Sequence, residues 1–220
     1  MKINYTMMGA GKTGGPIGLY HIMNKLVERG HEVSVTLPGG NADWLSPKVK
    51  QITPSDTRTR LSYLALGAAN IFFKRTMKED FYLSIYRTLD ILEKITPECD
   101  INVATYCFTA FPVFRSGKGI PFYHMQHYEE LFFTDPHRKA LARETYYLPL
   151  NKMANSIWLK GQVKEKFSED VPIVNPAIEH DIFRPRKVEK EDKKRVLCYG
   201  TNAEWKGFHD AIEAMKIVFK

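Results

Sequence analysis

The amino-acid sequence predicts an α/β fold, in which a parallel β-sheet is covered by helices on both faces. Apolar, β-rich segments alternate with amphipathic helical segments along most of the 220 residues. The chain opens with a strand, a glycine-rich turn, a helix and a second strand, which is the order of a βαβ unit. Such a unit places its two strands parallel with a right-handed crossover, and it therefore sets the direction of the expected sheet.

The first half of the chain is expected to contain two strands and three helices. The strands cover 2–8 and 32–38, and a helix over 15–29 joins them. Pro16 lies near the start of this helix, where its missing N–H is tolerated, and Gly30 follows the end. Residues 41–60 have no clear periodicity and are expected to be irregular, whereas 61–74 and 79–95 have helical patterns.

The second half continues the alternation. Strands are expected over 100–105 and 120–126, with a helix or turn over 107–116 between them. A helix over 138–153, a short strand over 154–158 and a helix over 159–167 follow. The apolar segment 171–178 closes the series. No internal repeat is present.

A change of composition divides the chain into domains. Residues 184–195 read RPRKVEKEDKKR, which predicts a charged linker after a first domain over 1–183. The remaining residues 196–220 contain a strand pattern over 196–200 and a helix pattern over 205–219. One strand and one helix cannot bury a core, so this segment is expected to be the beginning of a second, truncated domain.

Composition and charge indicate a cytoplasmic globular protein. The net charge of +7 favours a negatively charged partner or surface, but no zinc finger, RNP-like run or helix-turn-helix is recognisable, so nucleic acid is not expected. Residues 61–73 are too short to span a bilayer, and the N-terminus has no secretory signal. Cys99, Cys107 and Cys198 lack metal or redox spacing and are expected to be buried, reduced thiols.

The glycine-rich turn MGAGKTGG (8–15) imitates two nucleotide motifs. A mononucleotide P-loop needs a glycine at the position of Thr6, so that interpretation fails. Gly9, Gly11 and Gly14 fit the dinucleotide fingerprint, but the second strand ends without the expected acid and the next carboxylate is Asp43. An NAD(P)-dependent oxidoreductase is therefore a distant alternative.

Five segments in order resemble GT-B-fold retaining glycosyltransferases of family 4: the first three resemble the N-terminal domain, the fourth the hinge entry, and the last the first strand and helix of the donor-binding domain. They are the Gly-Gly turn with LVERGHEVSV (26–35), IPFYHMQHYEELFF (120–133), ANSIWLKGQVKEKF (154–167), VNPAIEHDIFRP (174–185) and VLCYGTNAEWKGFHDAIEAMK (196–216). The stretch from Gln126 to Glu129 looks most like the rhamnosyltransferase-like branch, where an aspartate is more usual in place of His127.

The sequence also departs from the family pattern. Ala177 stands at the usual hinge glycine and Thr201 at the usual arginine, whereas Lys206 and Gly207 match the family's lysine–glycine pair. The E-x7-E segment of the donor-binding domain would lie beyond Lys220. We therefore expect little or no turnover from this chain by itself.

The resemblance implies a Rossmann-like sheet that forms one half of a GT-B fold. It implies transfer of a hexosyl or deoxyhexosyl group from a nucleotide-sugar to a glycan or lipid-linked acceptor with retention, and it requires no metal or other cofactor. Gly14, Gly15, Lys206 and Gly207 are expected to bind donor or acceptor. His127 and Glu129 are the expected catalytic residues. The alternative is a non-catalytic half-enzyme or binding domain that needs a separate donor-domain partner.

Residues 58–87 combine cations with large apolar side chains. The segment contains Arg58, Arg60, Lys74, Arg75, Lys78 and Arg87 among Leu61, Tyr63, Leu64, Leu66, Ile71, Phe72, Phe73 and Phe81. A helix pair that covers the sheet is one interpretation. The other is peripheral contact with an anionic membrane at its inner, cytoplasmic face.

Overall fold

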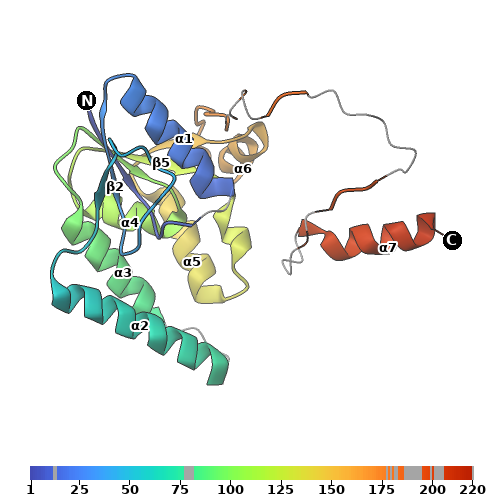
Figure 1. Cartoon of the computed structure of the whole chain (residues 1–220), viewed down its shortest axis with the longest axis horizontal. Coiled ribbons are helices and arrows are strands. Elements are labelled where there is room, and N and C mark those ends of the chain that lie inside the picture. The colour runs from blue at the N-terminus through green and yellow to red at the C-terminus, as the bar shows by residue number, and fades with distance from the viewer. Residues whose placement is uncertain are drawn as a thin grey trace. The chain divides into compact units, whose positions relative to one another are not determined.

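The computed structural model describes residues 1–11, 14–76, 82–176, 178, 180, 183–185, 195–198, 200 and 206–219. The chain divides into two compact units, Met1–Ile178 and Glu179–Lys220. The first unit contains a six-stranded sheet and the helices α1 to α6, and the second contains helix α7 (Figure 1).

All strand pairs in the sheet are parallel, and the strand order is β3-β2-β1-β4-β5-β6. The strands are β1 (Lys2–Thr6), β2 (Glu32–Thr36), β3 (Lys50–Ile52), β4 (Ile101–Ala104), β5 (Ile120–Met125) and β6 (Asn151–Ala154). Because β1 lies at the centre and the chain winds outward in both directions from it, the order reverses between β1 and β4. This reversal is the place where ligands bind in open α/β sheets.

Helices cover both faces of the sheet, as expected (Figure 1). They are α1 (Gly14–Glu28), α2 (Thr57–Thr76), α3 (Tyr82–Ile95), α4 (Cys107–Arg115), α5 (Pro136–Glu144) and α6 (Ile157–Phe167), with short 3-10 helices η1 (Glu129–Phe132) and η2 (Thr145–Tyr147). Tyr20 and Met23 of α1 pack with Val35 in one hydrophobic cluster. Phe108 of α4 packs with Tyr123 in the other. The Rossmann-like α/β class is therefore confirmed.

A buried polar network crosses the three central strands on the face opposite α1. The Asn4 amide donates to Asn102 Oδ1 at 2.9 Å, and its own Oδ1 accepts from the hydroxyls of Ser34 and Thr36, each at 2.9 Å. Thr6 Oγ1 donates to the same Asn102 oxygen at 3.2 Å. Hydrogen bonds between these side chains satisfy polar groups that would otherwise be costly to bury.

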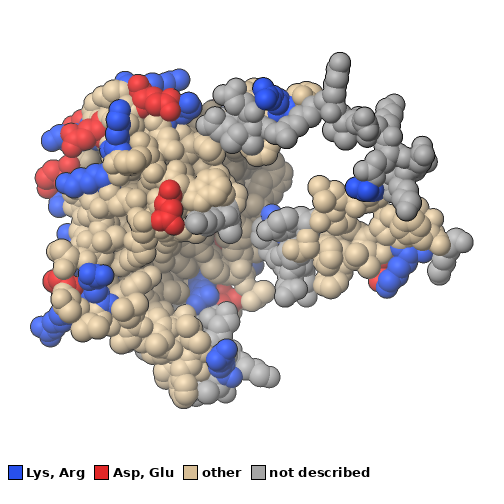
Figure 2. Space-filling model, viewed as in Figure 1, with Lys and Arg blue, Asp and Glu red and all other residues tan. Residues whose placement is uncertain are grey.

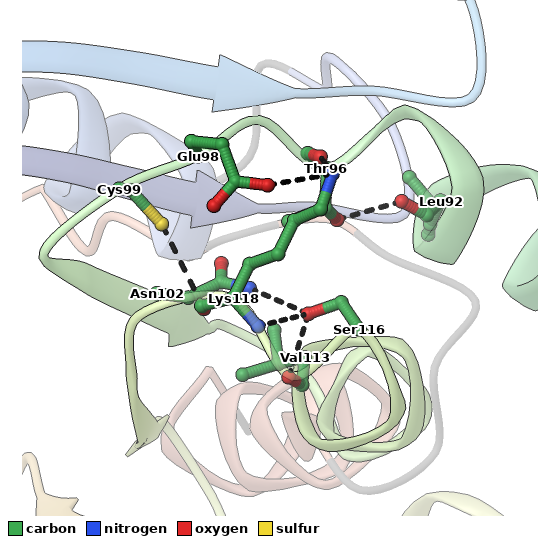
Figure 3. Close-up of polar contacts among 8 residues, drawn as sticks. All are labelled: Leu92, Thr96, Glu98, Cys99, Asn102, Val113, Ser116 and Lys118. Atoms are coloured by element: carbon green, nitrogen blue, oxygen red, sulfur yellow. Dashed lines mark hydrogen bonds and ion pairs between the residues drawn. The ribbon is translucent and has the colours of Figure 1, made fainter.

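A second polar cluster lies at the edge of the sheet where the strands begin, next to the ends of α3 and α4 (Figure 3). Lys118 Nζ donates to the carbonyl of Thr96 at 2.7 Å and lies 3.5 Å from Glu98 Oε1. Ser116 Oγ donates to the carbonyl of Val113 at 3.0 Å. These contacts join the end of α3 to the turn after α4 and so fix the entry to β5.

The structure corrects several predicted boundaries. Strand β3 lies inside the segment 41–60 that was expected to be irregular, and α2 begins at Thr57 because the Asp56 carboxylate accepts the Thr59 N–H at 2.7 Å. The helix expected over 138–153 ends earlier, and the following strand covers 151–154 instead of 154–158. The described residues of 171–178, all but 177, contribute only an isolated bridge between Ile173 and Ala154.

In the second unit, α7 (Phe208–Val218) forms within the helix expected over 205–219. The strand expected over 196–200 is absent from its described residues, 196–198 and 200, where Leu197 is 98% exposed. A strand needs a neighbouring strand for its backbone hydrogen bonds. Most of the predicted linker, 186–194, lies outside the described residues. All three cysteines are free, but only Cys107 is buried, so the expected burial is wrong for Cys99, which is half-buried, and for Cys198, which is exposed.

Candidate functional site

The candidate site lies at the carboxyl edge of the sheet, where the glycine-rich turn after β1 meets the loop after β5. Helix α1 begins at Gly14, and a Cβ built on Gly15 would lie 2.7 Å from Gln126 Oε1. Gly15 therefore allows the amide of Gln126 to approach the first turn of α1. By contrast, a Cβ on Gly14 would meet no described atom within 4 Å, so space is open in front of this glycine.

Gln126 connects three neighbouring strand ends. Its Nε2 donates to the carbonyl of Thr105 after β4 at 3.0 Å, and its own carbonyl accepts from Asn155 Nδ2 after β6 at 2.6 Å. The start of α1 thus faces a loop edge that hydrogen bonds hold in place. The N-terminus of a helix of this length presents backbone N–H groups and a partial positive charge to an anion.

His127 lies at this edge among aromatic rings. Its ring stacks on Phe132 with centroids 4.8 Å apart and lies 5.4 Å from the ring of Trp158. Nδ1 lies 3.1 Å from the carbonyl of Tyr128, which accepts only when Nδ1 carries the proton, so Nε2 is an acceptor in the neutral ring. Phe132 is 41% and Trp158 50% exposed. The histidine is therefore part of an open aromatic surface.

Glu129, the other predicted catalytic residue, lies inside the protein and is 1% exposed. Its carboxylate accepts hydrogen bonds from the backbone N–H of Cys107, at the start of α4, and from the Tyr123 hydroxyl. Burial raises the pKa of Glu129 to about 7, although these hydrogen bonds act in the opposite direction. The carboxylate thus anchors the loop after β5 to α4.

Glu130 is also buried. It accepts from the Tyr128 hydroxyl, and its Oε1 lies 3.7 Å from Arg143 Nη1. The sequence placed two adjacent carboxylates close to His127 but contained no signal that both would be buried in the 3-10 turn η1. Contacts with Cys107 and Tyr123 orient Glu129, and contacts with Tyr128 and Arg143 orient Glu130.

Lys206 and Gly207 lie in the second unit, Glu179–Lys220. Gly207 precedes α7 in the left-handed conformation with φ 65°, a conformation that glycine adopts without strain. The residues Lys12 and Thr13 of the glycine-rich turn lie outside the described residues.

The site lacks the acidic partner of a dinucleotide fingerprint within the described residues. Strand β2 ends at Thr36, whose hydroxyl belongs to the buried polar network. The exposed Asp43 accepts a hydrogen bond from Asn41 at 2.6 Å. In the described part of the chain, no three His, Cys, Asp or Glu side chains are grouped to hold a metal ion. None of the described helices is both long and apolar enough to cross a membrane.

Among known proteins, one is similar to this chain in sequence and another in fold. No protein-family model matches the chain. It is 26% identical over 179 residues to the O-antigen biosynthesis protein RfbC of Myxococcus xanthus, and the match covers 80% of this chain and 13% of that protein.

The fold is similar to that of Alr3699/HepE of Anabaena. The complex of that protein with UDP and glucose gives a TM-score of 0.51 and its UDP-glucose complex gives 0.52, both at 14% identity. Each alignment covers 84% of this chain but 47% and 46% of the HepE chains, respectively. The chain therefore spans about half the length of HepE and a small part of RfbC.

Proposed function

We propose that the chain is the N-terminal, acceptor-side half of a GT-B-type glycosyltransferase. The observation that carries the proposal is the contact of Gly15 with Gln126, because it brings the start of α1 beside the loop that bears His127. Similarity to a protein named for O-antigen biosynthesis, and a fold like that of a protein crystallised with UDP-glucose, support it. The enzyme transfers a sugar from a nucleotide-sugar to a glycan or lipid-linked acceptor with retention, without a metal.

In this proposal the chain's residues have distinct roles. Backbone N–H groups of Gly14 and Gly15 bind an anionic or hydroxyl group of the substrate at the positive end of α1. His127 accepts a hydrogen bond from a sugar hydroxyl through Nε2, while Phe132 and Trp158 offer apolar surface to the ring. Glu129 acts as a positioning residue because its carboxylate holds the His127 loop. In a second domain, Lys206 and Gly207 bind the donor diphosphate.

The sharpest test is a pair of glycine substitutions in α1. Gly14→Ala adds a methyl group to open space and leaves the melting temperature unchanged, but the methyl group blocks a ligand that approaches the backbone. Gly18→Ala is the matched control, because it also meets no described atom within 4 Å and lies one turn further from the site. We expect Gly14→Ala to lower kcat/KM for sugar transfer by about 100-fold and Gly18→Ala to have no effect.

Both variants are measured in the product of the complete reading frame and in this chain alone, with a panel of nucleotide-sugars and saccharide acceptors. Retention is checked from the anomeric configuration of the product by NMR. Equal kinetics of Gly14→Ala and the unsubstituted protein would remove the glycine turn from the site. Saccharide binding without transfer from any donor would instead favour the non-catalytic binding domain. Saturable NAD(P) binding would favour the oxidoreductase.

A further inference from the structure

Helix α2 exposes a continuous apolar face. Leu61, Leu64, Ile71 and Phe72 are between 60% and 65% exposed, and their spacing places them on one side of the helix together with the exposed Ala65 and Ala68. These six residues are called the α2 outer face below. In a water-soluble surface helix the apolar stripe normally faces the core, so the exposure of this stripe requires an explanation.

The opposite side of α2 already packs against the protein. Its half-buried residues are Thr59, Ser62, Tyr63, Leu66, Ala69, Asn70 and Phe73. The Tyr63 ring lies 3.2 Å from the Cβ position of Gly39, which places this side against the loop after β2. The side that faces the fold thus includes hydroxyl and amide groups, and the side that faces outward is more apolar. These contacts fix the orientation of α2 on the first unit. Its outer face is therefore not a surface that has yet to pack against the core.

Cations accompany the outer face. Arg58 and Arg60 are exposed near the start of α2 and Arg75 near its end, and the helix contains no Asp or Glu. Figure 2 shows the surface over α2, at the lower edge of the view, as largely uncharged with blue side chains near both ends. Asp56, the acid directly before α2, is engaged as the helix cap, and hydrogen bonds from Thr59 lower its pKa.

The exposed apolar stripe and its flanking arginines favour one kind of binding partner over another. A second copy of the face would bring its arginines close to those of the first, because cations lie at both ends of α2, and like charges oppose pairing. A helix of this length extends about 30 Å and can lie in the plane of a bilayer, with its leucine, isoleucine and phenylalanine side chains in the acyl boundary. Arginines at both ends then meet lipid phosphates, and each adds about 1 kcal/mol near an anionic surface.

We propose that the α2 outer face docks on an anionic lipid bilayer, with α2 parallel to the membrane plane. The proposal goes beyond sugar transfer and does not depend on it, since it rests on the exposed apolar stripe and its flanking cations. The protein would bind the surface reversibly, through about four inserted side chains and three arginines.

The test is vesicle flotation of the full chain at low salt, about 0.05 M, with phosphatidylcholine vesicles that contain or lack about 30% phosphatidylglycerol. We expect binding to the anionic vesicles, weaker binding to the neutral ones, and release of the protein at about 0.5 M salt. Leu64→Gln combined with Ile71→Gln should weaken binding about tenfold or more, because two apolar side chains no longer insert. The control is Ile120→Gln combined with Ile157→Gln, which removes two exposed isoleucines elsewhere and should bind like the unsubstituted protein.

A second measurement does not depend on a loss of binding. Ala68→Cys carries a polarity-sensitive fluorophore after the exposed Cys198 is replaced by Ser, and its emission should shift to the blue when anionic vesicles are added. Absence of flotation at low salt would overturn the proposal. So would equal binding by the Leu64→Gln, Ile71→Gln variant, or a concentration-dependent dimer that this variant abolishes, because the face would then be a contact between copies.

Discussion

At the scale of single residues, the buried carboxyl group of Glu129 links the stability of the fold to pH. Its pKa rises from an ordinary value of 4.5 to about 7, mainly because it is buried. Between these two values the folded state holds a proton that the unfolded chain has released. The free energy of unfolding therefore falls as the pH rises through this range, by about 3 kcal/mol for this group alone.

Glu129→Gln should remove this dependence. The amide oxygen can still accept the Cys107 N–H, but the side chain no longer ionises. Urea unfolding at about pH 5 and about pH 7.5 should show that the unsubstituted protein loses about 2 kcal/mol more than the variant over this interval. Glu165→Gln makes the same chemical change at an exposed position and serves as the control. Parallel curves for the protein and its Glu129 variant would contradict the prediction.

How far the sequence predicts the site also depends on individual residues. Gly14, Gly15 and His127 could be selected because a glycine turn before a helix and a histidine after a strand follow local rules. The approach of Gln126 to Gly15 and the burial of Glu129 could not be predicted. Both result from contacts between segments far apart in the chain, and periodicity within one segment contains no information about them.

At the scale of elements, the turn between α4 and β5 depends on Gly119. Its φ is 69°, and a Cβ there would lie 2.8 Å from the carbonyl oxygen of Cys99 and 3.1 Å from the carbonyl carbon of Asp100. These atoms belong to the backbone that enters β4 and cannot move aside like a side chain. The turn therefore tolerates only glycine.

Gly119→Ala should lower the free energy of unfolding by about 3 kcal/mol, through left-handed strain and the backbone clash. Gly161→Ala is the matched control within α6, where a Cβ meets no described atom within 4 Å. That variant should gain about 1 kcal/mol, because alanine favours a helix. Thermal and urea unfolding measure both. The explanation fails if the two substitutions have effects of the same sign.

The predicted elements were most accurate where a local signal marks their ends. The pattern over 138–153 appeared helical throughout, yet Leu148 is extended and Pro149 follows it, so the helix ends and β6 begins soon after. Strand β3 has three residues and shows no alternation long enough to detect. Its formation depends on pairing with β2, which the finished sheet provides.

At the scale of the whole molecule, both hydrophobic clusters consist of residues in the first unit, Met1–Ile178. No residue of α7 is buried. Among the described residues, the buried apolar core therefore lies in the first unit. The fold class was predictable at this scale because the repeated alternation of strand and helix limits the chain to a parallel, doubly covered sheet.

A chain that ends at residue 178 should unfold with one cooperative transition, within about 3 °C of the full chain. The reason is that deletion of residues 179–220 leaves both hydrophobic clusters intact. Differential scanning calorimetry of the two proteins measures this. A melting temperature lower by about 10 °C or more would mean that the second unit contributes to the core after all.

The hydrogen-bonded side chains of β2, β1 and β4 also discriminate against mispaired sheets. Asn4 lies level with Ser34 and Asn102, so the network forms only when the three strands align as they do here. A slip of β1 by one residue would turn Asn4 and Thr6 toward the apolar face beneath α1 and leave the Asn102 amide without them. Apolar strands alone would penalise such a slip weakly, because one β-branched side chain substitutes for another. The polar layer thus gives the sheet a unique alignment and makes misaligned folding intermediates costly.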